Sequence, residues 1–305
     1  MLKNKSIRKL LKRTVYFFIA GGACWIIVAY LSASYLTSTN QVFFDDISTF
    51  NGYNVQNLSF KTDDNIDVSS WYIQNSDSVA IILLSGIKGN RTHQLKRASF
   101  YLKKGFSILL PDLRGTGKTK GDIISFGWHE RKDLQACIKG LKEMNIKHIS
   151  ANGQSLGAAT IVYSFKEMND LDFVILESCY DNISNAFKNR VDKYPIPMFL
   201  FEPVKFFTER IIQEPQISLS PEQLIKKVTC PTLIIAGDKE DQIPIHETIK
   251  LYNNCGTSNK NLHFFKGGKH EDLYERFPDE YEKVISDFLH NQTEFNQLKQ
   301  SQSFD

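Results

Sequence analysis

The stretch Gly153-Gln154-Ser155-Leu156-Gly157 could carry nucleophilic chemistry, because it lies between a segment typical of a strand, residues 148–152, and a segment typical of a helix. In a Gly-x-Ser-x-Gly turn, the small flanking residues allow a tight, strained backbone that holds the serine hydroxyl above the edge of a sheet. The alternative interpretation is an ordinary tight turn into a helix. The sequence favours Ser155 as a nucleophile.

A serine hydroxyl is a weak nucleophile that needs a base, and the base needs an acid to orient it. In a sheet that carries such a turn, the acid and then a histidine follow the serine, each after a late strand. His270 lies in the glycine-rich "FFKGGKHEDL", between the last predicted strand and the last predicted helix, and the other histidines lie elsewhere. The segment "AGDKEDQIP" offers Asp238, Glu240 and Asp241 as the acid.

The elements that would position these residues alternate along the chain. Apolar runs predict strands at 79–85, 106–111, 148–152, 172–178, 231–237 and 261–265, and two short alternating runs at 57–62 and 66–73 predict a hairpin. Helical patterns lie between the later strands, and a terminal helix is expected at 273–290. This alternation predicts an α/β fold with a mostly parallel, eight-stranded sheet and helices on both faces.

The sheet domain is expected to span 55–290, with a small helical cap inserted at 184–229 and a disordered tail at 291–305. The cap is rich in apolar and aromatic residues. These side chains could line a channel for an acyl chain, contact a bilayer, or only pack the cap onto the sheet domain. They include Met198, Phe199, Leu200, Phe201, Phe206 and Phe207.

The N-terminus combines a basic segment, residues 1–13, with a long apolar run from Thr14 to Leu36, and no acidic residue occurs before Asp45. At about 1.5 Å per residue, a helix over this run is roughly 34 Å long, which is enough to cross a bilayer core of about 30 Å. We expect the run to be a transmembrane anchor and residues 37–54 to be a linker.

A cleaved signal peptide is the alternative, because Ala29, Ser32, Ala33 and Ser34 supply small residues for a cleavage site. The apolar run is longer than a signal core of roughly 7 to 15 residues, which favours an uncleaved anchor. The basic residues precede the run, and none follows it until Lys61. This asymmetry predicts a single-pass protein with a cytoplasmic N-terminus and an extracytoplasmic sheet domain.

The charge balance supports this division. The chain has 37 basic and 34 acidic residues, and removing the six basic residues before the anchor leaves 31 against 34. The basic surplus therefore comes from the six residues that indicate the orientation of the anchor, and no nucleic-acid-binding surface is expected.

Four cysteines follow the apolar run, and no two of them form a CxxC pair, so neither a zinc site nor a redox motif is expected. Each lies in or beside an apolar pattern and is expected to be a buried thiol. Their pairing stays open. They are Cys137, Cys179, Cys230 and Cys255.

The residues around the candidate acid resemble the α/β-hydrolase superfamily, especially its membrane-anchored branch of lipase-like and depalmitoylase-like serine hydrolases. The acid loop of that family reads Gly-x-x-Asp-x-x-Val/Ile-Pro, and Gly237, Ile243 and Pro244 fit this frame. The resemblance places the acid on Glu240, although Asp is usual there, and leaves Asp241 as the alternative.

The segment "SGIKGNR", residues 85–91, resembles the family's His-Gly-x-x-Gly-Asn-Arg loop, with Ser85 in place of the histidine. By resemblance, the backbone N–H groups of Ile87 and Leu156 form an oxyanion hole, which stabilises negative charge on the substrate oxygen. The resemblance covers about residues 55–289, nearly all of the chain after the anchor.

The resemblance implies a membrane-anchored serine hydrolase that cleaves carboxylic esters or thioesters of a small-molecule, lipid or acylated substrate, without a metal or an organic cofactor. A peptidase or an acyltransferase would use the same serine, histidine and acid. A non-catalytic binding protein could also keep the fold.

The stretch "DLRGTGKTKGD", residues 112–122, contains the Gly-Lys-Thr of a phosphate-binding loop. The full pattern needs a glycine where Asp112 stands and a helix directly afterwards, so no bound nucleotide is expected. The stretch instead resembles the superfamily's Asp-x-Arg-Gly-x-Gly-x-Ser turn, with Thr119 in the place of Ser. Asp112 and Arg114 are therefore expected to brace the loops around the site.

Overall fold

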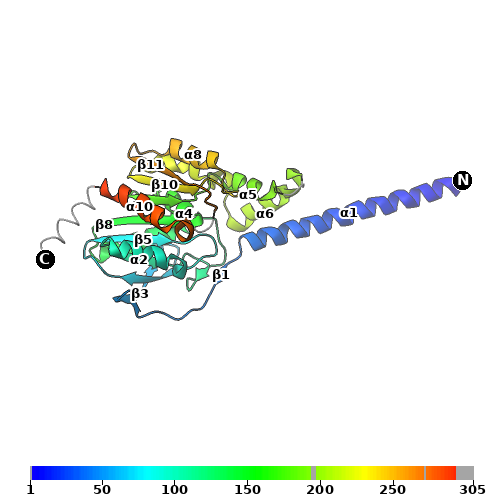
Figure 1. Ribbon diagram of the computed structural model, residues 1–305. Helices are drawn as coiled ribbons and strands as arrows, with labels where there is room; N and C mark the ends of the chain where they lie inside the picture. Colours follow the sequence, from blue (N-terminus) through cyan, green and yellow to red (C-terminus); the bar gives the residue numbers. More distant parts are fainter. Residues whose placement is uncertain (1, 194–196, 271–272, 293–305) are drawn as a thin grey trace.

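The computed structural model describes residues 2–193, 197–270 and 273–292, and over these residues it has a nine-stranded central sheet in the order β11-β10-β9-β8-β5-β6-β4-β3-β2 (Figure 1). The strands are β2 (Thr49–Phe50), β3 (Tyr53–Lys61), β4 (Asp67–Ile73), β5 (Val79–Leu84), β6 (Ser107–Pro111), β8 (His148–Gln154), β9 (Val174–Glu177), β10 (Thr232–Gly237) and β11 (Lys260–Phe265). The strands from β6 to β11 in this order pair in parallel, and β4, β3 and β2 pair antiparallel at one edge. The eight predicted strands are confirmed, and the two-residue β2 extends the edge.

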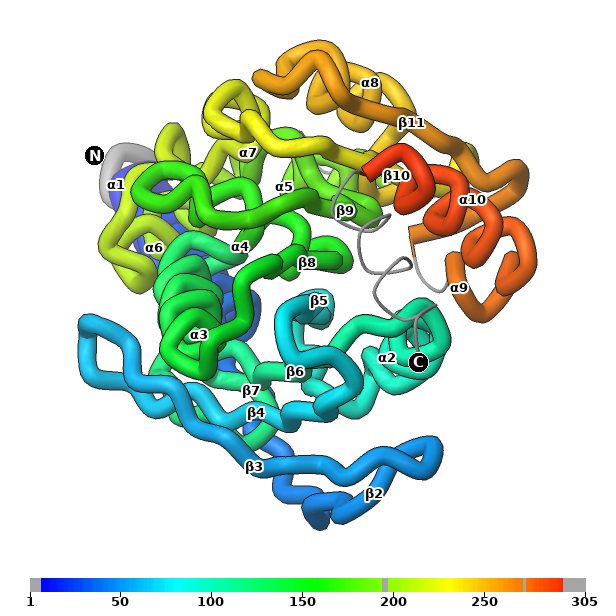
Figure 2. The backbone as a smooth tube through the Cα atoms, turned by 90° about the vertical axis from the view of Figure 1, so that its left-hand side faces the viewer, coloured from blue at the N-terminus to red at the C-terminus, as the bar shows by residue number. Residues whose placement is uncertain are grey.

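Helices cover both faces of the sheet (Figure 2). On one face α3 (Arg131–Glu143), α4 (Leu156–Ser164) and α8 (Ile245–Asn254) pack in one apolar cluster, and on the other α2 (Leu95–Lys103) and α10 (Pro278–His290) pack in a second. Strand β5 is apolar throughout because alternate side chains enter the two clusters, as expected of a parallel strand buried on both sides.

The terminal helix expected at 273–290 is wrong in one respect, because the structure has two helices there. These are α9 (Leu273–Arg276) and α10, separated by Phe277. Pro278 is the first residue of α10, a position that proline favours because its missing N–H has no intrahelical acceptor there. Proline inside a continuous helix would remove a backbone hydrogen bond.

The segment expected to form a cap consists of short helices in its described residues. These are α5 (Ile183–Val191), the 3-10 turn η2 (Met198–Phe201), α6 (Glu202–Ile212), the 3-10 turn η3 (Gln216–Ser218), α7 (Pro221–Leu224) and the 3-10 turn η4 (Ile225–Lys227). Several large apolar side chains stay exposed on this surface: Phe199, Phe206 and Ile217. Residues 293–305, expected to be a disordered tail, lie outside the described residues.

Helix α1 (Leu2–Leu36) extends away from the sheet domain (Figure 1). Within the described residues it is the one helix long and apolar enough to cross a membrane, over Ile7–Leu36. Its last turns pack against α6 of the cap: Ala29 and Ala33 are buried, and the Tyr30 ring meets Phe207 edge-on at 5.5 Å. Small residues four positions apart share a helix face and allow close helix packing.

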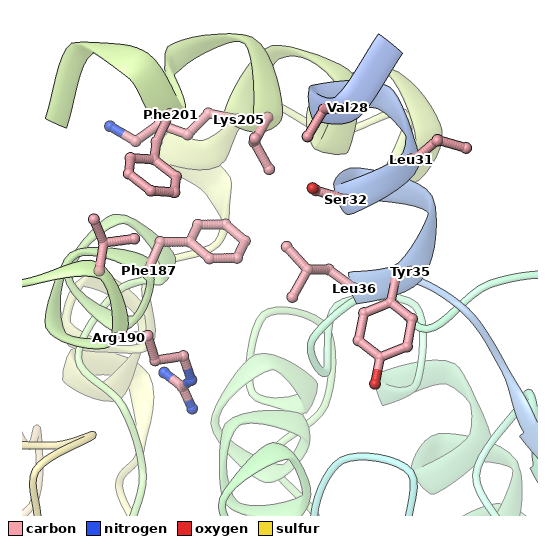
Figure 3. Close-up of a pocket in the computed structure, with 11 residues that line it drawn as sticks. Val28, Leu31, Ser32, Tyr35, Leu36, Phe187, Arg190, Phe201 and Lys205 are labelled. Carbon is pink, nitrogen blue, oxygen red and sulfur yellow. The ribbon is translucent and has the colours of Figure 1, made fainter. Parts of the chain in front are cut away.

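Beside this contact, Val28, Ser32 and Leu36 of α1 face Phe187 and Phe201 of the cap across a hollow (Figure 3). The end of the apolar helix therefore belongs to the packed part of the molecule, whereas its earlier turns stand free.

The segment after α1, residues 37–54, lies along the sheet domain. Its strand β1 (Asn40–Gln41) pairs in parallel with β7 (Thr116–Gly117), and the Trp71 indole N–H donates to Asp46 at 3.0 Å. These contacts hold the exit of α1 close to the loops at the edge of the sheet.

A buried polar cluster joins elements on the face of the sheet that α2 and α10 cover. Arg97 of α2 contacts Glu177 of β9, with 3.1 Å between Nε and Oε2, and the Tyr281 hydroxyl of α10 donates to the same Oε2 at 3.0 Å. Burial, together with the nearby Glu177 charge, raises the pKa of Tyr281 well above its usual range, so the hydroxyl keeps its proton. The cluster fixes both helices against β9.

Replacing Arg97 with methionine should lower the free energy of unfolding by about 3–5 kcal/mol, because Glu177 would remain buried without its cation. The neighbouring Lys96→Met removes an exposed ion pair to Glu275 and should cost about 1 kcal/mol or less. Thermal unfolding followed by tryptophan fluorescence checks both. Equal shifts in the two variants would contradict the assignment of the buried pair.

Candidate active site

Ser155 lies at the junction between β8 and α4, with φ 51° and ψ −107°. This left-handed conformation is strained for a residue with a side chain. It is possible because of the flanking glycines: a Cβ on Gly153 would lie 2.4 Å from the Gly157 carbonyl carbon, and one on Gly157 would lie 2.7 Å from Leu84. The turn therefore requires the residue types found on both sides of Ser155.

His270 and Glu240 continue from Ser155 in a line of hydrogen-bond contacts. His270 Nε2 lies 3.1 Å from Ser155 Oγ, and its Nδ1 lies 2.9 Å from Glu240 Oε2. Glu240 follows β10 and His270 follows β11, and these strands pair in parallel, so both loops leave the sheet at the edge where Ser155 lies. The arrangement can remove the Ser155 proton and stabilise the imidazolium that forms.

The structure separates the three acid candidates. Glu240 is buried and contacts the imidazole, whereas the Asp241 side chain is 75% exposed and pairs with Lys193 at 3.2 Å. Asp238 accepts a hydrogen bond from the backbone of Gly267 at 2.6 Å and so braces the histidine loop.

Ser178 is a residue of the site that the sequence did not single out. It follows β9 with φ 49°, and its hydroxyl and the Gly237 N–H both donate to Glu240 Oε1, at 2.5 and 2.7 Å. These bonds leave Oε2 for His270. Its position directly after a buried strand, next to the strand that carries the acid, is the signal that could have found it.

The loop after β5 lies next to Ser155. A Cβ on Gly86 would be 3.7 Å from the Cβ of Ser155, and Ile87 lines the same cavity as Ser155 and Leu156. Leu156 is the first residue of α4, so its N–H has no intrahelical acceptor. Ser85, which stands where the family has histidine, is buried and donates to the carbonyl of Asn90 at 2.7 Å.

No family model matches the chain. It is 28% identical over 246 residues to an uncharacterised membrane protein of Saccharomyces cerevisiae, YNL320W, covering 78% of this chain and 80% of that protein. It is 26% identical over 237 residues to the serine hydrolase BPHL of Mus musculus, covering 69% and 79%.

Among solved structures, it is similar to the Pyrococcus furiosus esterase Pf2001, with a TM-score of 0.72 and 22% identity over 84% of this chain and 98% of that one. The chain has the α/β-hydrolase fold. Its serine, histidine and glutamate sit in the loops that this fold uses for nucleophile, base and acid.

The loop that carries Ile87 is tied to the end of α1. Lys88 Nζ donates to the Tyr35 carbonyl at 3.1 Å and to Ser38 Oγ at 2.9 Å, and it lies 4.3 Å from the centre of the Tyr35 ring. Asn40 Nδ2 in turn donates to the Lys88 carbonyl at 2.6 Å. The last turn of the apolar helix and the segment after it therefore hold this loop in place.

The stretch at 112–122, which resembled a phosphate-binding loop, folds around the carboxylate of Asp112. Arg91 donates to Asp112 from Nε at 2.9 Å and from its second guanidinium nitrogen at 2.7 Å, and the Lys118 N–H donates to Asp112 at 2.8 Å. A Cβ on Gly117 would lie 2.2 Å from this carboxylate. The ion pair joins the turn after β6 to the end of the loop that carries Ile87.

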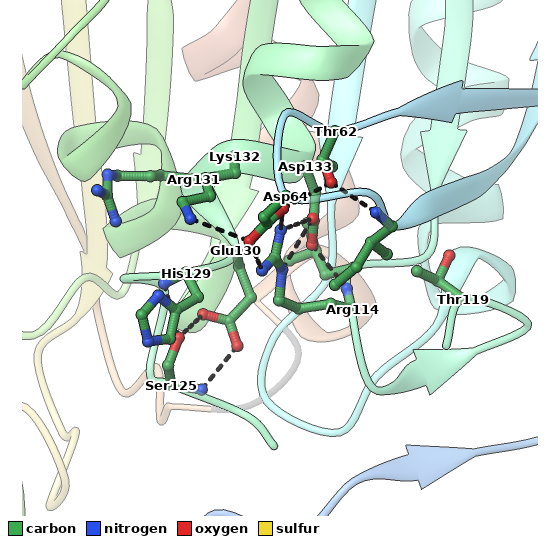
Figure 4. A network of polar contacts seen from close by, with 12 residues as sticks. Thr62, Asp64, Arg114, Thr119, Ser125, His129, Glu130, Arg131, Lys132 and Asp133 are labelled. Atoms are coloured by element: carbon green, nitrogen blue, oxygen red, sulfur yellow. Dashed lines mark hydrogen bonds and ion pairs between the residues drawn. The ribbon is translucent and has the colours of Figure 1, made fainter. Parts of the chain in front are cut away.

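Arg114 forms a second brace, from the same turn to α3 and to the β3–β4 hairpin (Figure 4). It donates to Asp133 at 2.9 Å and to Asp64 at 2.8 Å. Burial alone would raise the pKa of Asp64, but hydrogen bonds from Arg114, Thr62 and Lys132 hold it well below its usual range. The carboxylate stays charged and the brace intact at neutral pH.

Two cavities of different character lie at the site, one at Ser155 and one at His270. One, about 270 Å³, has Ser155 in its wall and is lined mainly by apolar side chains, among them Phe126, Ile183 and Phe187. The other, about 310 Å³, is lined by His270, Asp241 and Gln242 together with four cations: Lys193, Lys239, Lys269 and Arg276.

In the described part of the chain, no group of three or more His, Cys, Asp or Glu side chains is placed to hold a metal ion. All five cysteines are free thiols, and the four in the sheet domain are buried, as expected from their apolar surroundings.

Glu240→Gln should lower kcat for p-nitrophenyl butyrate by about 10³–10⁴-fold, because an amide cannot stabilise the imidazolium and favours the wrong tautomer. Asp241→Asn makes the same chemical change one residue away and should leave kcat unaltered. Steady-state hydrolysis by both purified variants checks this. A large loss in Asp241→Asn with little loss in Glu240→Gln would reverse the assignment.

Lys88→Met should lower kcat by about ten-fold with little change in KM, because the loop that carries Ile87 would lose its tie to α1 but keep its sequence. This loss is smaller than the 10²–10³-fold expected when an oxyanion donor is removed. Lys103→Met, an exposed lysine at the end of α2, is the control. Unchanged kcat in Lys88→Met would show that the tie does not position the loop.

Proposed function

We propose that this protein is a membrane-anchored serine hydrolase that cleaves carboxylic esters or thioesters. The observation that carries the proposal is the unbroken contact line from Ser155 Oγ through His270 to the buried Glu240. The similarity to a serine hydrolase and to an esterase of the same fold supports the reaction class.

In the proposed reaction, His270 Nε2 takes the hydroxyl proton as Ser155 Oγ attacks the substrate carbonyl carbon. The negative charge that develops on the carbonyl oxygen is held by the N–H groups of Ile87 and Leu156. His270 then gives its proton to the departing alcohol or thiol, which leaves an acyl group on Ser155. Water, deprotonated by His270, then attacks the acyl carbon, and His270 returns the proton to Ser155 Oγ as the bond to the serine breaks and the acid leaves.

Helix α1 serves as the anchor in this proposal, with the basic residues 1–13 in the cytoplasm and the hydrolase domain on the extracytoplasmic side. The helix is long and apolar enough to span, and a relative of similar length is described as a membrane protein. The buried Ala29 and Ala33, packed on the cap, favour a retained anchor over a cleaved signal.

A fluorophosphonate probe should label the full-length protein in detergent on one residue, and Ser155→Ala should lose both the label and ester hydrolysis. Ser164 is a buried serine at the end of α4, the helix that follows Ser155, and Ser164→Ala should keep both. Mass spectrometry of the labelled peptide checks the position. Undiminished labelling of Ser155→Ala would refute the proposed nucleophile.

A further inference from the structure

An apolar hollow of about 480 Å³ lies between the last turns of α1 and the cap (Figure 3). Its walls come from both elements. Val28, Ser32 and Leu36 project from α1, and Phe187, Phe201 and Val204 project from the cap. The apolar helix therefore supplies one side of a cavity, besides its packing against α6.

This hollow adjoins the cavity at the nucleophile. Four residues line both: Tyr35, Leu36, Phe187 and Arg190. The Arg190 guanidinium donates hydrogen bonds to the Ala186 carbonyl at 2.6 Å and to the Gln242 side chain at 2.7 Å. Together the two cavities give a largely apolar path from Ser155 to the level of Val28, well inside the apolar run of α1.

A second cavity, lined in part by His270, is mainly polar. The cavity lined by Lys193, Lys239, Lys269 and Arg276 is on the His270 side and shares only Gln242 with the apolar cavity at the nucleophile. A substrate whose carbonyl lies at Ser155 thus meets a mainly apolar cavity at the serine and has a cavity rich in cations next to His270. An ester with an apolar chain and a polar leaving group matches this division.

We propose that the hollow between α1 and the cap binds the acyl chain of a long-chain ester or thioester, with the anchor helix as one wall of the substrate site. This inference rests on the proposed function. From Val28 to Leu36 the helix covers about 12 Å, so a short acyl group at Ser155 fills only the inner cavity and a long one reaches along α1. Because α1 is the element suited to cross the bilayer, the outer end of the hollow lies where a lipid-borne chain enters.

The test compares p-nitrophenyl butyrate with p-nitrophenyl palmitate on the full-length protein in detergent micelles. Ser32→Trp fills the hollow from α1, and Val204→Trp fills it from the cap. Each should lower kcat/KM for the palmitate by about ten-fold or more relative to the butyrate. Ile27→Trp, an exposed position on the same helix that does not line the hollow, should leave the ratio unchanged.

If the palmitate-to-butyrate ratio of kcat/KM is unchanged in both filling variants, even where both values fall, the acyl site is overturned. Hydrolysis by the wild type would still uphold the proposed function. Cetyl acetate carries its long chain on the alcohol and not on the acyl group. If the filling variants lose hydrolysis of cetyl acetate but keep that of the palmitate, the hollow binds the leaving group and the inference is overturned. Failure of the wild type to hydrolyse either p-nitrophenyl ester or to take the fluorophosphonate label would instead remove the proposed function.

Discussion

The contact between Ser155 Oγ and His270 Nε2, 3.1 Å long, joins positions 115 residues apart, and the rest of the structure serves to make it possible. It requires β8, β9, β10 and β11 to lie side by side in parallel, so that the loops after them open at one edge. It also requires the strained turn at Ser155, which only the small residues around it allow. The buried Arg97–Glu177 pair, one strand away, holds two helices against this part of the sheet.

The apolar N-terminal helix is integrated into this arrangement. Its last turns pack on the cap through Ala29 and Ala33, the segment after it pairs with β7, and Lys88 ties the Tyr35 carbonyl to the loop beside Ser155. A tether would need none of these contacts. The proposed role of the helix in binding an acyl chain gives them a common reason, because the position of the helix then sets the shape of the site.

Much of the fold followed from local patterns. Runs such as that of β5 are apolar because both faces of the strand are buried, and the turn at Ser155 has a motif with a steric cause. The choice of Glu240 over Asp241 came from a family resemblance, and the contact with His270 agrees with it, while its catalytic role stays a prediction. The break at Phe277 followed from Pro278, which the periodicity of the apolar residues concealed.

Other features could not be predicted because they depend on pairs of residues far apart in the chain. The position of Ser178 after a buried strand places it near the site, but its bond to Glu240 joins residues 62 positions apart, and nothing near Lys88 indicates its contact with Tyr35. The cap's aromatic residues allowed a channel, a membrane contact or simple packing. Only the placement of α1 against them separates these roles: Phe201 lines the hollow, Phe207 packs against Tyr30, and Phe199 stays exposed.

The central claim is that the nucleophile and the anchor helix belong to one substrate site. A long-chain fluorophosphonate with a photoreactive diazirine at the end of its chain tests this most directly. After reaction and irradiation of the full-length protein, peptide mass spectrometry should find the phosphonate on Ser155 and the crosslink on α1 between Val28 and Leu36 or on the facing cap helices. Crosslinks confined to other surfaces, with the phosphonate on Ser155, would contradict the account.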